Sequence, residues 1–320
     1  MVKCFYCKNP ASTYRPYSGE YLCRSCFSRS IEKKVQKTIN KYSLLEETDV
    51  VAVAVSGGKD SLSLLNILYK LERGLHATRL VAITIDEGIS NYREESLKFA
   101  KELSSKLGIE HKIYSFKDIF SYTFDELINL LREYDVDYSS PCSYCGVLRR
   151  TALNYGARDV GATKLATAHN LDDESQTMIM NFLRADFNRI FRTGPKLEKI
   201  HEGFVPRIKP LTEIPEREIV LYAYFNSLPL HSQSCPYAQE ALRNDARRFL
   251  NEMEATRPEV KYNILRTGDR IRSLTRFLDQ GLKIEVCMKC GEPTTQSLCK
   301  SCRILQMISD IGARGKPRNI

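Results

Sequence analysis

The eleven cysteines of this chain are the residues whose spacing most directly predicts chemistry. Eight of them form two sets of paired Cys-x-x-Cys turns. Two such turns can place four thiolates around one ion, which is the ligand set of a structural zinc ribbon. Because neither segment has enough apolar residues for a core of its own, we expect one Zn²⁺ in each, with unligated structural thiols as the alternative. The sets are Cys4, Cys7, Cys23 and Cys26, and Cys287, Cys290, Cys299 and Cys302.

The three remaining cysteines do not complete a quartet. Cys142 and Cys145 form an unmatched Cys-x-x-Cys, and Cys235 is far from them in the sequence. Three thiolates can hold a [4Fe–4S] cluster and leave one iron open to a non-protein ligand. Alternatively, two of them can act as a pair that carries a persulfide and then resolves it. Buried structural cysteines are a third interpretation. Pro141 and Pro236 predict that both segments are shaped turns and not helix interiors.

A second chemical feature is the hexapeptide Ser56-Gly-Gly-Lys-Asp-Ser61. It follows the β-branched run Val50–Val55, which is typical of a strand buried on both faces, and it precedes a helical pattern at 61–69. A glycine-rich turn between a strand and a helix N-terminus aims backbone N–H groups at one point and favours an anion there. The spacing is neither that of the Walker A loop nor that of the Rossmann fingerprint. A purely structural glycine turn is the alternative.

These residues need a scaffold, and the sequence predicts a parallel α/β sheet. Strand-like runs alternate with helical patterns, which favours a parallel sheet covered by helices on both faces. Ligands of such sheets bind beyond the carboxyl ends of the strands. The predicted strands are Val50–Val55, Leu80–Ile85, Lys112–Tyr114 and Lys164–Ala168.

Four polar residues follow these strands and become candidate ligands of a nucleotide. Asp86 can reach a ribose or an adenine edge, or it can cap a turn. His169 can contact phosphate or satisfy a backbone carbonyl. One of Asp172 and Asp173 is expected to be a helix N-cap, and the other can hold Mg²⁺ on a pyrophosphate or orient a target base.

Composition and charge narrow the class of protein. The net charge is +9, no stretch is long and apolar enough to span a bilayer, and the first residues lack a signal-peptide pattern, so we expect a cytoplasmic protein with no membrane partner. Basic clusters near an anion site favour a polyanion such as RNA, although each cluster alone is ordinarily a solvated face. They are Lys33, Lys34, Lys37 and Lys41; Arg184, Arg189 and Arg192; and Arg243, Arg247 and Arg248.

The motifs divide the chain into five predicted segments. These are an N-terminal zinc ribbon at 1–30, a basic linker helix at 31–48, a catalytic α/β domain at 49–235, a helical extension at 236–283, and a C-terminal zinc ribbon with a basic tail at 284–320.

The loop at Ser56–Ser61 resembles that of the PP-loop ATP pyrophosphatases, which cut ATP between the α- and β-phosphates and use the AMP to activate a carbonyl oxygen. Together with the cysteine sets, it makes the whole chain resemble the tRNA 2-thiouridine-forming sulfurtransferases. Five segments resemble the branch that thiolates the wobble uridine, the cytoplasmic tRNA 2-thiolation protein 1 type. They are Cys142–Arg150, Ala168–Asp173, Met180–Asp186, Glu218–Phe225 and Ser234–Ala238.

The resemblance implies an α/β fold in which a parallel-sheet PP-loop domain (adenine nucleotide alpha hydrolase-like) is flanked by two small zinc ribbons. It also implies adenylation of the C2 oxygen of uridine, with release of pyrophosphate and then AMP. Lys59 would neutralise charge at the α-phosphate, and Asp173 would be the catalytic aspartate. Cys142, Cys145 and Cys235 match the family's cluster ligands. The candidate ATP-binding residues are Ser56, Gly57, Gly58, Lys59, Asp60, Ser61, Asp86, His169 and Asp172.

The expected partners are ATP, Mg²⁺, tRNA and a sulfur donor, either sulfide, a persulfide or a ubiquitin-like thiocarboxylate carrier; a homodimer is possible by resemblance. Arg149 and Arg150 are candidate contacts to phosphates or to the tRNA backbone. Three alternatives stay open: thiolation of 5-methyluridine in the T-loop (position 54), a non-thiolating PP-loop adenylating enzyme, and an inactive zinc-ribbon RNA-binding protein. The leftover cysteines argue against the second, and the intact PP-loop argues against the third.

Overall fold

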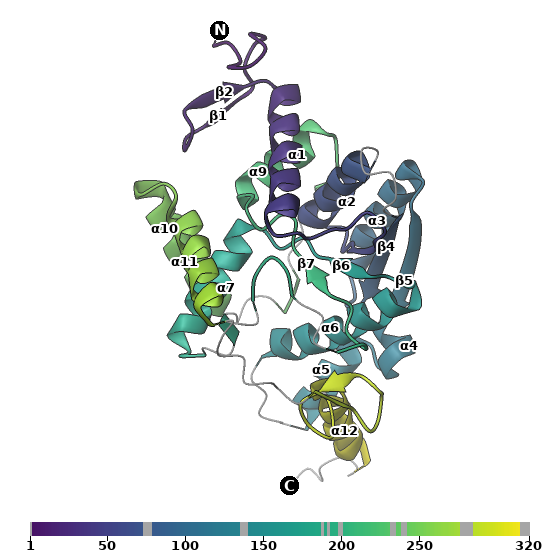
Figure 1. Cartoon of the computed structure of the whole chain (residues 1–320). Helices are drawn as coiled ribbons and strands as arrows, with labels where there is room; N and C mark the ends of the chain where they lie inside the picture. Colours follow the sequence, from purple (N-terminus) through teal and green to yellow (C-terminus); the bar gives the residue numbers. More distant parts are fainter. Residues whose placement is uncertain are drawn as a thin grey trace.

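A parallel five-stranded sheet forms the centre of the molecule in the computed structural model, which describes residues 2–72, 79–134, 140–186, 189–190, 193–197, 201–230, 235–237, 242–275 and 284–313. The order is β5-β4-β3-β6-β7, and every neighbouring pair is parallel (Figure 1). The predicted α/β fold with a parallel sheet is therefore confirmed. The strands are β3 (Val50–Ala54), β4 (Arg79–Asp86), β5 (Glu110–Ser115), β6 (Lys164–Ala166) and β7 (Arg207–Ile208), the last of which the sequence analysis missed.

Helices cover both faces of this sheet because its strands present apolar side chains to both sides. On β4, Leu80 and Ala82 face one cluster, and Val81 and Ile83 face another. The first cluster lies under α1 (Arg24–Lys41), α2 (Lys59–Glu72), α3 (Arg93–Leu107) and α9 (Glu216–Phe225). The second is covered by α6 (Pro141–Asp159). Strands of this kind, buried on both faces, give the continuous apolar runs seen in the sequence.

A further apolar cluster joins α6 to three more helices. These are α4 (Phe116–Phe120), α5 (Phe124–Glu133) and α12 (Lys300–Ala313), and their contacts are aromatic and aliphatic, including Phe116, Phe124 and Ile308. The cluster fixes the C-terminal ribbon, which includes α12, against the central sheet.

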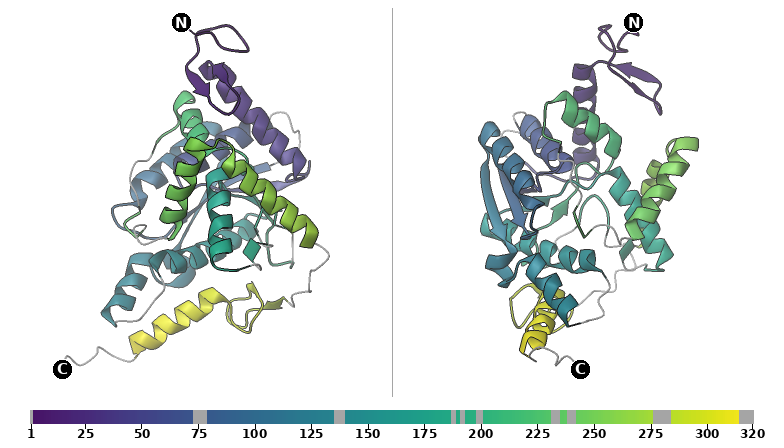
Figure 2. Two further views of the ribbon diagram at one scale, coloured as in Figure 1. Left: turned by 90° about the vertical axis from the view of Figure 1, so that its left-hand side faces the viewer. Right: turned by 180° about the vertical axis from the view of Figure 1, so that it is seen from behind.

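Three helices lie to one side of the sheet, α7 (Leu171–Leu183), α10 (Leu242–Thr256) and α11 (Val260–Thr275) (Figures 1 and 2). Both α10 and α11 pack on α7, with Ala246, Leu250 and Leu265 buried. Since α7 follows β6 directly, the arrangement places α10 beside the end of that strand.

The two ribbons lie at opposite ends of the molecule (Figure 1). The first contains the hairpin of β1 (Thr13–Arg15) and β2 (Glu20–Leu22), and the second that of β8 (Glu285–Val286) and β9 (Pro293–Thr294). The first is anchored to α9 by the buried ion pair of Arg15 with Glu218, 2.7 Å long. No helix in the described residues is both long and apolar enough to cross a membrane.

The basic helix differs in its bounds from the prediction of 31–48, because it runs as α1 from Arg24 to Lys41. One face of the helix is apolar and packs on the core, since Phe27, Ile31, Val35 and Ile39 are buried. Of its lysines, Lys34 is not a solvated cation: it lies over the rings of Tyr17 and Tyr262. Arg192 and the basic tail after Ala313 lie outside the described residues.

Candidate active site

The loop Ser56–Ser61 connects β3 to α2, and its backbone is held by its own serines. The Ser61 hydroxyl accepts from the backbone N–H of Ser56 at 3.1 Å and donates to the carbonyl of Gly58 at 2.9 Å. Gly57 has φ +85°, and a Cβ at this position would lie 1.9 Å from the carbonyl oxygen of Ser96. Only glycine fits, because both the backbone conformation and the space exclude a side chain.

The position of this loop in the sheet marks it as a ligand site. β3 pairs with β4 on one side and with β6 on the other, so the chain leaves the carboxyl ends of β3 and β6 in opposite directions. Ligands of doubly wound sheets bind at this switch point. The segment His169–Asp173, after β6, therefore lies beside the PP-loop, as the sequence analysis expected.

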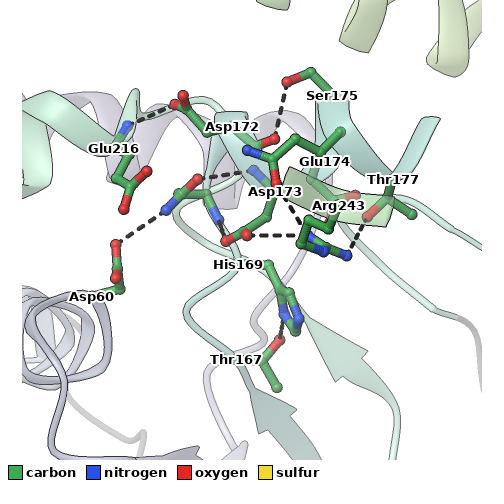
Figure 3. A network of polar contacts seen from close by, with 12 residues as sticks. Asp60, Thr167, His169, Asp172, Asp173, Glu174, Ser175, Thr177, Glu216 and Arg243 are labelled. Atoms are coloured by element: carbon green, nitrogen blue, oxygen red, sulfur yellow. Dashed lines mark hydrogen bonds and ion pairs between the residues drawn. The ribbon is translucent and has the colours of Figure 1, made fainter. Parts of the chain in front are cut away.

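A direct hydrogen bond joins the two segments. Asn170 donates from Nδ2 to Asp60 Oδ1 at 3.1 Å (Figure 3). Asn170 is also the N-cap of α7, and Asp173 is its partner in a capping box. The prediction that Asp172 or Asp173 is the N-cap is therefore wrong by two or three positions: Asn170 takes that position, and the Asp173 side chain accepts from the backbone N–H of Asn170.

Asp172 and Asp173 have different surroundings. Asp172 is buried, and its Oδ2 accepts from the backbone N–H of Glu216 at 2.8 Å (Figure 3). Its Oδ1 is paired with Lys261. It therefore joins α7, α9 and α11. Asp173 is partly exposed and lies 3.3 Å from Arg243 Nη1. Of the two, Asp173 is the one placed to meet a ligand.

The electrostatics of the site favour a bound cation between carboxylates. Desolvation raises the pKa of Asp173, and Arg243 opposes this in part. Desolvation also raises the pKa of Asp60, to which the nearby Asp173 contributes. Because the charge of Asp173 disfavours ionisation of Asp60, a divalent cation at these two carboxylates would be stabilised by their negative charge.

Lys59 begins α2 and carries the positive charge of the loop. Its Nζ lies 2.8 Å from Asp60 Oδ2 and 2.7 Å from Glu216 Oε1. Although desolvation acts to lower it, these carboxylates raise the pKa of Lys59. The side chain is thus charged and lies at the helix N-terminus, where phosphates bind.

The other two candidate nucleotide ligands, Asp86 and His169, form hydrogen bonds within their own segments. Asp86 accepts at Oδ1 from the backbone N–H of Gly88 at 2.9 Å, which is the turn-capping alternative named for it. His169 is bonded through Nδ1 to the Thr167 hydroxyl at 2.9 Å (Figure 3). Its ring is accessible to solvent, yet partial desolvation and the nearby Lys209 lower its pKa to about 4. The ring is therefore neutral at pH 7.

The unmatched cysteines come together from two segments. Cys142 and Cys145 lie in the first turns of α6, with Pro141 at the start of the helix, so the predicted turn is wrong for this segment: proline is well tolerated there. The Cys142 thiol donates to the carbonyl of Tyr237 at 3.2 Å. This contact brings the segment that contains Cys235 to the N-terminal end of α6. Burial raises the pKa of Cys145 to about 11.

Two residues that the sequence analysis missed, Glu87 and Arg93, connect this cysteine site to the PP-loop. Arg149 donates to Cys145 Sγ at 3.3 Å and pairs with Glu87 at 2.7 Å. Glu87 also pairs with Arg93 at 2.8 Å, and Arg93 donates to the carbonyl of Ser56 at 3.1 Å. The available signal was the position of Glu87 directly after Asp86, at the carboxyl end of a central strand.

Each cysteine quartet has the geometry of a metal site. The four ligand atoms of either set lie within 4.8 Å of one another, with Cys7 and Cys23 sulfurs 3.5 Å apart and those of Cys290 and Cys299 3.6 Å apart. A tetrahedral zinc site with Zn–S bonds of about 2.3 Å gives sulfur separations of about 3.8 Å. The residues therefore fit Zn²⁺ at both ends.

Comparisons with known proteins agree with this geometry. Residues 27–254 match the PP-loop domain, and residues 3–28 match the N-terminal LIM domain of the 2-thiouridine synthetase TtuA. The cytoplasmic tRNA 2-thiolation protein 1 of Drosophila erecta is 37% identical over 98% of this chain and 88% of its own length. The chain belongs to this family. A probable sulfurtransferase of Methanocaldococcus jannaschii is 35% identical over 95% of the chain and 88% of its own.

A solved structure is also similar to almost the whole of this member of the cytoplasmic tRNA 2-thiolation protein 1 family. The U34-tRNA thiolase NcsA from Methanococcus maripaludis with its [4Fe–4S] cluster has a TM-score of 0.81 at 33% identity, with 96% of each chain covered. In this structure the sulfurs of Cys142, Cys145 and Cys235 are not all within 4.8 Å of one another, whereas the four sulfurs of each quartet are.

Proposed function

We propose that this protein is an ATP-dependent tRNA sulfurtransferase that replaces the C2 oxygen of the wobble uridine, position 34, with sulfur. The observation that carries the proposal is the continuous connection from the PP-loop through the buried Arg93 and Glu87 to Arg149 and Cys145. An adenylating loop and a sulfur site built into one network serve a reaction that needs both. Full-length similarity to the U34-tRNA thiolase supports the same substrate.

In the first step the C2 oxygen of uridine attacks the α-phosphorus of ATP. An oxygen–phosphorus bond forms, the bond to the β-phosphate oxygen breaks, and pyrophosphate leaves. The loop amides at Ser56–Ser61 and the Lys59 ammonium hold the phosphates and neutralise the charge that develops on them. Asp60 and Asp173 supply the carboxylates for Mg²⁺, and Asp173 lies on the exposed side.

In the second step a sulfur nucleophile adds at C2 and AMP departs with the former C2 oxygen. Cys142, Cys145 and Cys235 would hold a [4Fe–4S] cluster, which supplies an iron that binds the incoming sulfide. Arg149 donates to Cys145 Sγ and so offsets negative charge at the thiolates, while Glu87 fixes its guanidinium. In the persulfide alternative the Cys142 thiolate, which is exposed whereas Cys145 is buried, would attack the outer sulfur of a persulfide donor and take over that sulfur while the donor's thiolate leaves.

The ribbons and partners complete the proposal. Zn²⁺ in each quartet is structural, because all four positions are thiolates. The cytoplasm is the proposed location, since the relatives are named as cytoplasmic proteins. The sulfur donor is proposed to be sulfide or a thiocarboxylate carrier. The division of the chain into five segments and the formation of a homodimer are also proposals.

A mapped thiolation assay tests this function. Protein purified anaerobically with reconstituted iron receives ATP, Mg²⁺, sulfide and unmodified tRNA, and mass spectrometry of nuclease fragments locates the added sulfur. Sulfur at position 34 is expected. Sulfur at position 54 would move the activity to the T-loop, and AMP release without sulfur in any fragment would overturn the thiolation.

A matched variant separates the two steps. Cys235→Ala is expected to abolish thiolation while AMP still forms in the presence of tRNA, because Cys235 is absent from the adenylation site. Full activity of protein that contains no iron would reject the cluster in favour of the persulfide.

A further inference from the structure

A pocket of about 350 Å³ lies outside the site described above, between α6, β7 and the C-terminal ribbon. One wall is a single face of α6, formed by Val147, Arg150 and Asn154, and the opposite wall belongs to the ribbon, with Pro293 and Ser301. Both lie at the same end of the molecule (Figure 1). The volume is within the range of small-molecule sites, which begins at about 300 Å³.

Two arginines line the pocket without a carboxylate partner. Arg207 donates through Nη2 to the backbone carbonyl of Arg150 at 3.0 Å, which holds the two residues together. In the described part of the chain, neither guanidinium makes an ion pair. The one carboxylate in the lining, Glu292, is bonded to Arg158 and Asn154 instead.

Their charges are held in an unfavourable environment. Desolvation, and then the nearby Arg150, lower the pKa of Arg207 to about 10. Desolvation also lowers the pKa of Arg150, to which Arg189 and Arg149 contribute. Two adjacent guanidinium groups, that of the half-buried Arg207 and that of the exposed Arg150, form a site that an anion would stabilise, and their planar donors suit a phosphate.

The other residues that line the pocket indicate a ligand that contains more than a phosphate group. Phe204 offers an aromatic ring, and Val147, Leu197 and Pro293 add apolar surface. The hydroxyls of Thr151 and Ser301 lie 2.8 Å apart on the pocket wall. A ligand that combines an anionic group with a planar ring and polar edges is a nucleotide, and aromatic rings stack on bases of any identity.

We propose that this pocket binds one nucleotide of an RNA strand, with its phosphate between Arg150 and Arg207 and its base against Phe204. The assignment rests on the proposed function in so far as that RNA is the tRNA substrate. It also gives the C-terminal ribbon a role in substrate binding, because Cys299, Lys300 and Ser301 form part of the wall.

Direct binding of unmodified tRNA tests the pocket. Arg150→Gln is the main variant because this side chain is exposed and makes no ion pair in the described residues, so its loss leaves the fold intact. We expect an affinity about tenfold lower and a log–log salt slope reduced by about 0.7–0.9, the contribution of one phosphate. Phe204→Leu is expected to lower affinity about fivefold with the slope unchanged, since stacking is lost and no charge is.

The matched control is Arg79→Gln, an exposed arginine on β4 paired with Glu110 away from the pocket. It is expected to bind tRNA as the unaltered protein does. Equal affinity and slope in Arg150→Gln and Arg79→Gln would overturn the assignment. UMP or inorganic phosphate binding that depends on Arg150, with tRNA binding unaffected, would also overturn it in favour of a free anion.

The same variants separate this inference from the proposed function. If the unaltered protein binds tRNA through Arg150 but adds no sulfur, the pocket stands and the function fails. If Arg150→Gln thiolates position 34 with unchanged tRNA affinity, the function stands and the pocket assignment fails.

Discussion

The carboxylate of Glu87 lies 2.7 Å from Arg149 Nε through one oxygen and 2.8 Å from Arg93 Nε through the other. Its side chain is only 3% exposed. One buried anion thus pairs with two cations that belong to different sites, Arg149 at the cysteines and Arg93 at the carbonyl of Ser56. Burying charged groups costs desolvation free energy, and removing one partner of a buried ion pair strongly destabilises the fold. The two arginines are therefore held in place around Glu87.

Glu87→Gln is predicted to reduce thiolation by at least tenfold while AMP formation is affected less. The neutral amide cannot hold both guanidinium groups, so Arg149 loses its orientation at Cys145. The measurement is the ratio of thiolated tRNA to AMP. Because an unpaired buried arginine also destabilises the fold, by roughly 3–5 kcal/mol, thermal unfolding is followed in parallel.

Glu110→Gln is the matched control for that change, since Glu110 also pairs with an arginine but is exposed. It is expected to leave both products and the unfolding temperature unchanged. Equal losses of AMP and thiolated tRNA in Glu87→Gln would contradict a role specific to sulfur transfer.

Lys59→Ala is predicted to lower the rate of AMP formation by about 10²–10³-fold, because the charge that offsets the developing phosphate charge is lost. Single-turnover assays with saturating ATP measure it. Lys70→Ala, at the other end of α2 and paired with Glu32, serves as control. A Lys59→Ala rate within threefold of the control would remove this residue from the chemistry.

Asp173→Asn is predicted to lower activity by at least 10²-fold and to stabilise the fold at neutral pH. The folded-state pKa of Asp173 is raised above 3.8 by desolvation, so the ionised carboxylate disfavours folding, and stability falls as pH rises through the raised pKa. The amide removes this cost and still accepts from Asn170. The gain in the free energy of unfolding should vanish below pH 3.8.

Asp173→Ala separates capping from catalysis, because it loses the capping box as well. It should be less stable than Asp173→Asn by about 1 kcal/mol. For the unaltered protein, activity is expected to fall as pH drops through the raised pKa of Asp173. A stability of Asp173→Asn that parallels the unaltered protein at every pH would refute the electrostatic explanation.

Cys302→Ser, which removes one ligand of the proposed C-terminal zinc site, is predicted to loosen α12 from α5 and α6 and to weaken tRNA binding. The ribbon docks through Glu292 on Arg158 and Asn154, and its thiolates fix that docking surface. Zinc content by elemental analysis should fall by one ion per chain, with faster proteolysis at 284–313. Unchanged zinc content would reject the quartet as a metal site.

The sequence carried much of the fold and of the candidate site. β-branched runs, the Ser-Gly-Gly-Lys-Asp-Ser spacing and the paired cysteine turns are local features, so the parallel sheet, the PP-loop and both thiol quartets could be predicted from them. β7 was missed because two residues at a sheet edge carry no periodic signal. The N-cap of α7 was misassigned because an aspartate and an asparagine are equally good caps, and only the backbone position selects Asn170.

What the sequence determined by itself is the chemistry available: thiolates for metals, a glycine turn for phosphates, and carboxylates after parallel strands. What the tertiary structure decided is which groups meet. It buried Asp172 against Lys261, left Asp173 exposed beside Asp60, and joined the PP-loop to Cys145 through Glu87. Those pairings depend on how α7, α9 and α11 pack, and on the loops after β3 and β4 that carry Ser56 and Glu87. Because the paired residues are far apart in the chain, they meet only when the core forms.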